Sequence, residues 1–128
     1  MKPRIYIAGP CTGLPLDNYP AFNAEAARLR SIGFIVENPA ESPRQDNWLA
    51  YMRQSIRQML TCDAVALLPA WKRSKGALIE HGLAISLGIK ARPCAEYQAK
   101  QADPKCWLCD GSGWCVDDNC PICMEVKA

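Results

Sequence analysis

The segment AVALLPAWKRSKGALIEHGLAISLGIKA, residues 64–91, contains one complete unit of the pattern that decides the fold. Its apolar start, residues 64–69, is typical of a buried strand that ends at a proline. A basic loop follows, and residues 76–87 have the composition of a helix that Gly88 ends. A short second strand is predicted at residues 89–91. Because a helix separates the two strands, they are expected to run parallel in one sheet.

The same alternation of strands and helices extends toward the amino terminus. The runs RIYIA (residues 4–8) and FIVEN (residues 34–38) predict two further strands. Apolar residues recur at helical spacing in residues 18–32 and again in residues 47–60, as expected for two amphipathic helices. The sequence therefore predicts an α/β fold, a small Rossmann- or flavodoxin-like three-layer sandwich with a parallel sheet of about four strands. The apolar face predicted for the second of these helices consists of Trp48, Met52, Ile56, Met59 and Leu60.

Length and composition favour one folded domain with a small appendage. Of the 128 residues, 1–95 are predicted to form the α/β domain, 96–104 a linker and 105–128 a cysteine-rich tail. No apolar run is long enough to span a membrane, and the start of the chain lacks the core of a signal peptide. We therefore expect a cytoplasmic protein with no membrane partner. A net charge of +2 also lacks the basic excess of a general nucleic-acid binder.

Ser74, Gly76 and Glu80 lie at the predicted start of the last helix, at spacings of two and four residues. In an open α/β sheet, ligands bind at the edge where strands end and helices begin. The unpaired N–H groups of a first helical turn suit an anion, Gly76 allows close approach and Ser74 adds a hydroxyl, so these residues suit a phosphate. Glu80 can reach a ligand held there. The spacing by itself also fits a solvated helix-face carboxylate with Ser74 as the helix cap.

The charges around Glu80 predict that it is ionised. Lys72, Arg73 and Lys75 precede it in the sequence, and the positive end of the helix dipole is close by. Both effects stabilise a carboxylate, which is the form in which a glutamate acts as a nucleophile.

The order of four motifs carries a resemblance to a known family. RIYIAGP, ENPAE, CDAVALLP and SKGALIEHGLAISLG, spread over residues 3–92, resemble the nucleoside 2-deoxyribosyltransferase-like superfamily, in particular a phage and prophage branch whose members mostly lack an assigned function. In that superfamily a glutamate of the last core helix attacks the anomeric carbon of the sugar, and the matching residue is Glu80. Tyr6 and the turn Gly9-Pro10 match the segment that shapes the base and sugar pocket. The resemblance also implies a homodimer or larger homo-oligomer, because close relatives complete each pocket with residues of a neighbouring subunit.

Two positions distinguish this chain from the transferases that act on free nucleosides. Those enzymes place an acid six residues before the glutamate, where this chain has Ser74. A serine there, followed by Gly76, is similar to the 2′-deoxynucleoside 5′-phosphate N-hydrolases, in which both contact the phosphate, so a nucleotide substrate is implied. The substrate-orienting aspartate of the superfamily matches Ser55, which has no carboxyl group. Either another acid, with Asp46 as a candidate, replaces it, or catalysis is feeble or absent.

Some other residues near these motifs have two interpretations. Trp71 either flanks the pocket, the interpretation we favour, or supports its loop. Arg53 and Arg57, one helical turn apart, either cover a phosphate or lie on a solvated face. His81 is the single histidine of the chain and, directly after Glu80, does not share its helix face, which favours a packing or surface role.

The tail contains two CxxC pairs that are ten residues apart. Each pair chelates from one tight knuckle, and four thiolates complete a tetrahedral Zn²⁺ site that can fold a segment too small to fold alone. The predicted ligands of this structural zinc are Cys106, Cys109, Cys120 and Cys123, with Cys115 as an alternate. Loose thiols and an iron–sulfur cluster are the competing interpretations.

The residues and the resemblance together predict an enzyme that cleaves an N-glycosidic bond or transfers a deoxyribosyl group on a nucleoside 5′-monophosphate. The predicted catalytic residues are Glu80 as nucleophile with Ser55 and Tyr6, and the predicted substrate-binding residues are Gly9, Pro10, Ser74, Gly76, Trp71 and Asp46. Such a cleavage needs no redox cofactor. Two alternatives stay open: a nucleotide-binding or sensing module of weak or no activity, and a zinc-ribbon interaction protein whose α/β part is a scaffold.

Overall fold

The structure is a computed structural model that describes residues 3–98. In this part of the chain, β-strands alternate with α-helices, joined by loops and short 3₁₀ turns. In chain order the elements are β1 (Arg4–Ala8), α1 (Tyr19–Ile32), β2 (Ile35–Glu37), α2 (Trp48–Met59), β3 (Ala64–Leu67), α3 (Lys75–Ser86) and β4 (Lys90–Pro93). The strands form one 4-stranded sheet in the order β2-β1-β3-β4, and all its pairs are parallel. The predicted α/β fold with a parallel sheet is confirmed.

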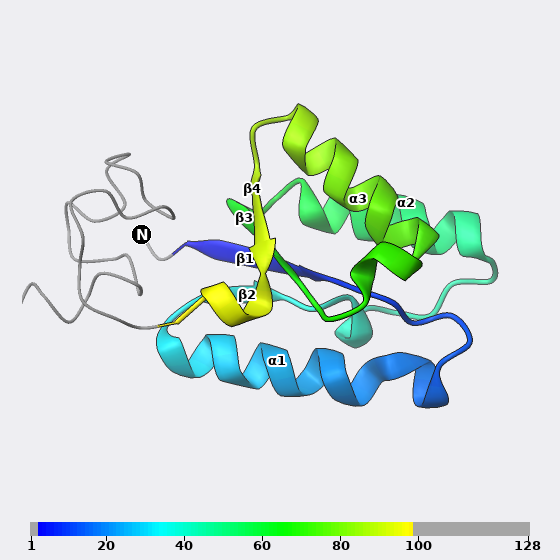
Figure 1. The fold of residues 1–128 in the computed structure, drawn as a ribbon. Coiled ribbons are helices and arrows are strands. Elements are labelled where there is room, and N and C mark those ends of the chain that lie inside the picture. Colours follow the sequence, from blue (N-terminus) through cyan, green and yellow to red (C-terminus); the bar gives the residue numbers. More distant parts are fainter. Residues whose placement is uncertain (1–2, 99–128) are drawn as a thin grey trace, which may run out of the picture.

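The sheet lies between two helical layers, with α1 on one face and α2 and α3 on the other (Figure 1). Side chains alternate along a strand, so neighbouring residues of β1 enter different layers. Ile5 and Ile7 pack in the core beneath α1, whereas Tyr6 and Ala8 pack in the core beneath α2 and α3. This alternation places Tyr6 on the face of the sheet that α3 covers.

Helix α2 buries only part of its predicted apolar face. Of its predicted apolar face only Met59 is buried, while Trp48 and Leu60 are 37% and 49% exposed. The helix begins where the side chain of Asn47 accepts the N–H of Ala50 at 2.9 Å. Trp48, Tyr51 and Met52 of its first turns line a cavity. The predicted apolar face thus reaches the core at Met59, while Trp48 at the start and Leu60 just after the helix stay partly exposed.

The packed core extends to Tyr97, past the expected domain end near residue 95. The hydroxyl of Tyr97 donates to the carbonyl of Val65 at 2.7 Å, and its ring meets that of Phe34 with centroids 5.8 Å apart. Arg28 on α1 donates to the carbonyl of Tyr97 at 2.8 Å. These contacts tie the segment after β4 to α1 and the sheet. Most of the predicted linker and the whole cysteine-rich tail lie outside the described residues.

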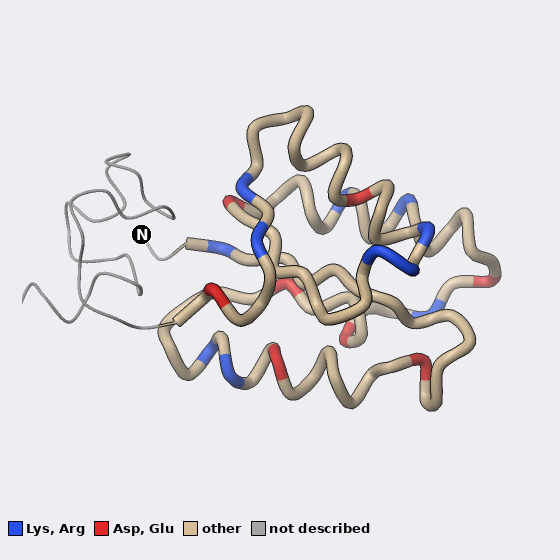
Figure 2. Tube along the Cα trace, in the orientation of Figure 1, with Lys and Arg blue, Asp and Glu red and all other residues tan. Residues whose placement is uncertain are grey.

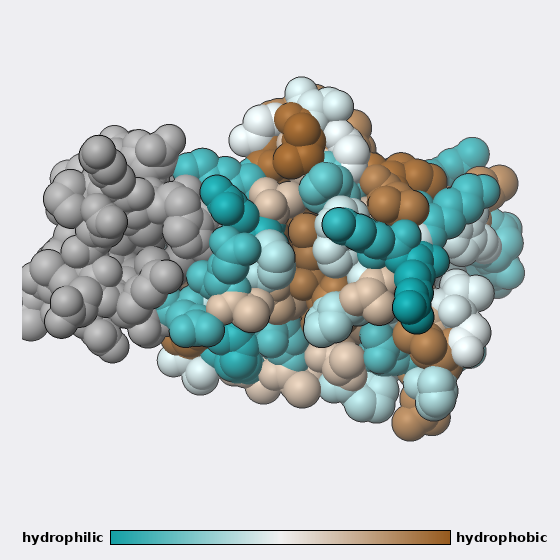
Figure 3. Space-filling model, viewed as in Figure 1, coloured by the Kyte–Doolittle hydropathy of each residue, from teal (hydrophilic) through white to brown (hydrophobic). Residues whose placement is uncertain are grey.

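The described surface is mixed in character. Lys and Arg positions gather near the start of α3 (Figure 2), and apolar patches interrupt the hydrophilic surface (Figure 3). Leu78, Ile79 and Ile85 of α3 are among the exposed apolar side chains. None of the helices in residues 3–98 is long and apolar enough to cross a membrane.

Candidate functional site

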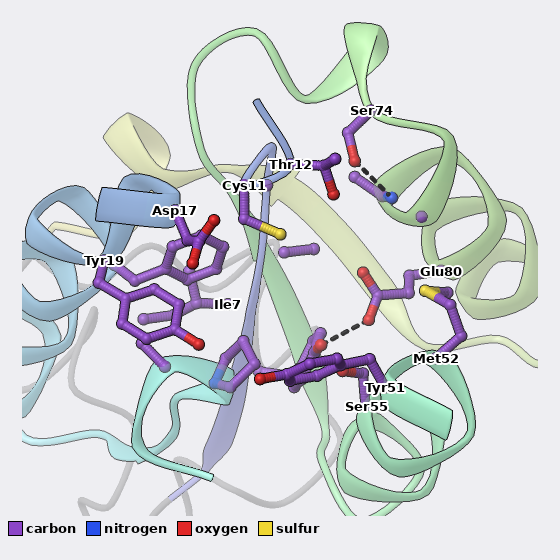
Figure 4. Close-up of a pocket in the computed structure, with 18 of the residues that line it drawn as sticks. Ile7, Cys11, Thr12, Asp17, Tyr19, Tyr51, Met52, Ser55, Ser74 and Glu80 are labelled. Carbon is purple, nitrogen blue, oxygen red and sulfur yellow. Dashed lines mark hydrogen bonds between the residues drawn. The ribbon is translucent and has the colours of Figure 1, made fainter. Parts of the chain in front are cut away.

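A cavity of about 180 Å³ opens at the carboxyl end of β1, between the starts of α1, α2 and α3 (Figure 4). This is the edge of the sheet at which the sequence predicted a ligand. The predicted site residues that line the cavity are Tyr6, Gly9, Ser55, Ser74, Gly76 and Glu80. The fold brings them together from separate parts of the chain, on or beside β1, α2 and α3.

Glu80 projects from the second turn of α3 into the cavity and is 5% exposed. The hydroxyl of Tyr6 donates a hydrogen bond to its Oε2 at 2.5 Å, drawn as a dashed line in Figure 4. Tyr6 is buried, and the hydroxyl of Ser55 on α2 lies near enough to lower its pKa slightly. Figure 4 shows the second carboxylate oxygen of Glu80 directed into the cavity. The contact with Tyr6 therefore holds one oxygen and leaves the other to face a ligand.

Burial raises the pKa of Glu80 to about 7, and the hydrogen bond from Tyr6 offsets only part of that rise. The pKa of Tyr6 is raised well above its ordinary value, first by burial and then by the charge of Glu80. A hydroxyl with a raised pKa stays protonated, so Tyr6 remains a donor. Glu80 exchanges its proton near neutral pH, where a carboxyl group can serve as an acid, a base or a nucleophile.

The prediction that neighbouring basic residues keep Glu80 ionised is wrong, because burial outweighs their charge. The ammonium groups of Lys72 and Lys75 lie over the rings of Trp71 and Trp48, at 5.7 and 4.8 Å from the ring centroids. Both lysines are exposed, so water screens their charge from the buried carboxyl group.

The start of α3 is shaped by capping and close packing. The Oγ of Ser74 accepts the N–H of Ala77 at 3.1 Å, which is the cap of the simpler interpretation, yet its hydroxyl hydrogen can still be donated to a ligand. A Cβ on Gly76 would lie 2.9 Å from the Sδ of Met52, so this glycine lets α2 pack against the helix start. A Cβ on Gly9 would lie 2.7 Å from the Cβ of Leu68, the residue after β3. Packing therefore explains both glycines, and both border the cavity.

Three residues predicted to bind the substrate do not line this cavity: Pro10, Trp71 and Asp46. Trp71 stacks on His81, with ring centroids 4.5 Å apart, beside a second hollow next to β4. The carbonyl of Pro10 accepts a hydrogen bond from the side chain of Asn18 at 2.8 Å, so this turn supports the neighbouring loop. Asp46 is exposed on the bend before α2. Local contacts or exposure account for all three positions, and a contact of each with a substrate stays a prediction.

Arg53 and Arg57 are exposed on α2 and also lie outside the cavity lining, in agreement with the solvated-face interpretation. Among residues 3–98, no lysine or arginine belongs to that lining. A bound anion would therefore depend on N–H and hydroxyl groups at the start of α3.

The opposite wall of the cavity was not predicted. It contains Asp17 from the segment between β1 and α1, Tyr19 at the first position of α1, and Tyr51 from α2 (Figure 4). Leu16, Asp17 and Asn18 have φ angles of +52°, +53° and +61°. This left-handed conformation costs roughly 1–2 kcal/mol per residue, and Asp and Asn tolerate it best. The nearby hydroxyl of Tyr51 and burial raise the pKa of Tyr19, so the two tyrosine side chains lie close to each other.

Two signals in the sequence point to this wall. Asp17 and Tyr19 follow β1 at the same edge of the sheet as the segment before α3, so the strand-end rule applies to both loops. Tyr51 stands four residues before Ser55 and therefore shares its helix face.

The fold and the cavity define a parallel α/β protein with a buried carboxyl group at the strand-end edge. Residues 3–92 match the family described as Domain of unknown function (DUF4406), and the chain belongs to this family. No curated protein matches the chain.

Within residues 3–98, no group of three or more His, Cys, Asp or Glu side chains is arranged to hold a metal ion. The predicted zinc ligands, Cys106, Cys109, Cys120 and Cys123, and the alternate Cys115 lie outside the described residues. The zinc site therefore stays a prediction from cysteine spacing.

Proposed function

We propose that the protein breaks the N-glycosidic bond of a nucleoside 5′-monophosphate, by hydrolysis or by deoxyribosyl transfer, with Glu80 as the nucleophile. The observation that carries the proposal is the buried contact of Tyr6 with Glu80, 2.5 Å between oxygens, in the wall of the strand-end cavity. One carboxylate oxygen is held and the other points into the cavity. The resemblance to the nucleoside 2-deoxyribosyltransferase-like superfamily supports the same role for Glu80.

The proposed reaction has two steps. First, the cavity-facing oxygen of Glu80 forms a bond to C1′ of the sugar as the bond from C1′ to the base nitrogen breaks. The bonding electron pair leaves with the base, which takes up a proton from water. Then water, or the nitrogen of a second base, attacks C1′ and gives up a proton to the solvent, while the bond from C1′ to Glu80 breaks and Glu80 leaves as a carboxylate. Because only the carboxylate attacks, the rate is expected to rise as the pH passes about 7.

The start of α3 supports a phosphate as part of the substrate. Ser74 borders the cavity and can donate its hydroxyl hydrogen, and the first turn of the helix has N–H groups without helical partners. Tyr6 would position Glu80 from the other side through its hydrogen bond to the carboxylate, and Ser55 lies next to Tyr6 in the same cavity.

A second candidate function is a nucleotide-binding or sensing module of weak or no activity. Ser55 favours it, because it lines the cavity at the position where the superfamily has an aspartate and offers only a hydroxyl group. This candidate predicts binding without release of the base.

An assay of base release tests the proposal. Nucleoside 5′-monophosphates and their nucleosides are incubated with the protein between pH 5 and 8, and free base is measured by HPLC. We expect release by the wild type and a loss of at least about a thousandfold in Glu80→Gln, which keeps the shape of the side chain but cannot attack. Equal rates in the two proteins would overturn the role of Glu80. Nucleotide binding in calorimetry with no release of base would favour the sensing module.

We also propose one structural Zn²⁺ in the tail, held by Cys106, Cys109, Cys120 and Cys123, with no redox cofactor. The support is the spacing of the two CxxC pairs. Protein purified under reducing conditions is expected to contain about one Zn²⁺ per chain, and chelation is expected to expose the tail to protease while residues 3–98 stay folded. Elemental analysis that finds no metal in such protein would contradict the site.

Finally, we propose a homodimer or larger homo-oligomer in the cytoplasm. Leu78, Ile79 and Ile85 are exposed on α3, and their burial against a second copy would favour association. The free thiols of Cys11 and Cys62 are compatible with a reducing compartment. A monomer mass in light scattering would contradict the oligomer. Export of the protein from the cell, detected by fractionation, would contradict the cytoplasmic location.

A further inference from the structure

The two sides of the cavity differ in chemistry. Glu80 and Ser74 lie on one side, and Asp17 and Tyr19 on the other, with Tyr51 reaching in from α2 (Figure 4). Flat tyrosine rings suit a nucleobase, which stacks on aromatic side chains. Under the proposed function, on which this inference rests, the sugar lies against Glu80 and the phosphate near Ser74. The base then extends toward the tyrosines and meets Asp17.

The backbone holds Asp17 at this place. Its φ of +53° lies within a run of left-handed residues, and its N–H donates to the carbonyl of Leu14 at 3.0 Å. The side chain of the next residue, Asn18, donates to the carbonyl of Pro10 at 2.8 Å and so ties the loop to the end of β1. Strained backbone that is pinned in this way is often kept for function.

The carboxylate of Asp17 is available to a ligand. Its side chain is 53% exposed, and the guanidinium of Arg44 approaches it only to 3.8 Å, from a side chain that is 81% exposed. Such a long ion pair between exposed groups is weak. A ligand with better-placed donors can therefore replace it.

We propose that Asp17 selects the base by accepting hydrogen bonds from N–H groups on the base edge, and that guanine is the preferred base. A carboxylate has two acceptor oxygens and no donor. Guanine places a ring N–H beside an exocyclic amine, and this pair of donors matches the two oxygens as the fork of an arginine does. A base that presents a carbonyl oxygen to Asp17 would leave both acceptors unpaired and is disfavoured.

Two nucleotides that differ by a single amino group test the proposal. 2′-Deoxyguanosine 5′-monophosphate and 2′-deoxyinosine 5′-monophosphate share their sugar and phosphate, so those contributions cancel in the ratio of dissociation constants. Titration calorimetry uses the Glu80→Gln protein, in which no ligand is consumed. We expect the guanine nucleotide to bind roughly tenfold more tightly, the scale of one charge-assisted hydrogen bond.

The decisive variant adds Asp17→Asn to this protein. Asparagine tolerates the left-handed backbone, so the variant is expected to fold, and thermal unfolding checks this. Because the amide replaces one acceptor oxygen by a donor, the ratio is expected to fall to about one. The matched control is Asp63→Asn, which removes an exposed carboxylate just before β3, outside the cavity, and is expected to keep the ratio.

Equal affinity for the two nucleotides, or an unchanged ratio in Asp17→Asn, would overturn base selection by Asp17. The proposed function fails in a different way. If the guanine nucleotide binds with the expected preference but the protein with Glu80 intact releases no base, the cleavage is refuted and the role of Asp17 stands. If neither nucleotide binds, both proposals are overturned.

Discussion

The two walls of the cavity are built in different ways. Tyr6 and Glu80 stand on β1 and α3, regular elements that pack on the sheet, and both side chains are buried. Asp17 stands on a left-handed segment between elements, and its side chain is half exposed. Regular elements hold reacting groups accurately, whereas loops vary in the ligands they recognise. We call the side with Tyr6 and Glu80 the α3 wall and the side with Asp17 the loop wall. Substitutions on the α3 wall are expected to alter both stability and activity, and substitutions on the loop wall to alter ligand preference with little effect on stability.

The largest expected effect is a loss of stability with rising pH that originates at Glu80. Its pKa in the folded protein, about 7, is above the ordinary value of 4.5, so the folded state retains a proton that the unfolded chain has already released. The stabilising contribution is therefore complete below the ordinary value and is lost as the pH rises through about 7. The shift corresponds to about 3 kcal/mol.

Urea unfolding at pH 5 and at pH 8 measures this effect. In Glu80→Gln the side chain does not titrate, so the difference in free energy of unfolding between the two pH values should shrink by about that amount. The same difference in wild type and variant would show that Glu80 is better solvated than its burial implies. This test depends on the buried wall alone and needs no substrate.

The regular half of the molecule could be predicted from the sequence because its signals are periodic. The strand at residues 4–8 is observed as β1 with the same bounds, and the apolar spacing up to Gly33 predicted α1. Ser74 and Glu80 could be placed at the strand-end edge because helix starts and strand ends meet there by topology. These relations depend on neighbouring residues or on the order of the elements along the chain, so the sequence alone predicts them.

The rest depends on contacts between distant residues. Glu80 is buried because residues of α2 and β1 lie next to it in the folded chain. The spacing of residues along α3 does not predict that burial. The left-handed segment at Asp17 contains no glycine, so the sequence gives no signal for this conformation. It is supported instead by the hydrogen bond from Asn18 to the carbonyl of Pro10. The sequence therefore predicted the place of Glu80 but neither its protonation nor the wall that faces it.

A smaller effect is expected for Tyr6→Phe, which removes the hydroxyl that donates to Glu80. A buried carboxyl group without its donor costs about 1–3 kcal/mol, and the pKa of Glu80 should rise further because the hydrogen bond lowers it. The pH at which stability falls should move upward in urea titrations. Tyr51→Phe, on the side of the cavity opposite Glu80, also removes a hydroxyl group. Because Tyr51 is only half-buried, this variant should lose less free energy of unfolding than Tyr6→Phe. Equal losses in the two variants would remove the distinction between the walls.

The smallest expected effect comes from Ser74→Ala at the edge of the α3 wall. Loss of the cap to Ala77 should reduce the free energy of unfolding by about 1 kcal/mol. If the same hydroxyl donates to a phosphate, the preference for a nucleoside monophosphate over its nucleoside should also shrink in calorimetry.

Asn47→Ala separates these two roles of Ser74. Asn47 caps α2 by accepting the N–H of Ala50 at 2.9 Å, and it does not line the cavity. Its loss should cost a similar amount of stability, because the capping geometry is the same, and should leave the preference for the monophosphate intact. If both variants lose stability alike and neither changes the ratio of affinities, Ser74 is a helix cap only, and a phosphate bound here would be held by the backbone N–H groups of α3 without its help.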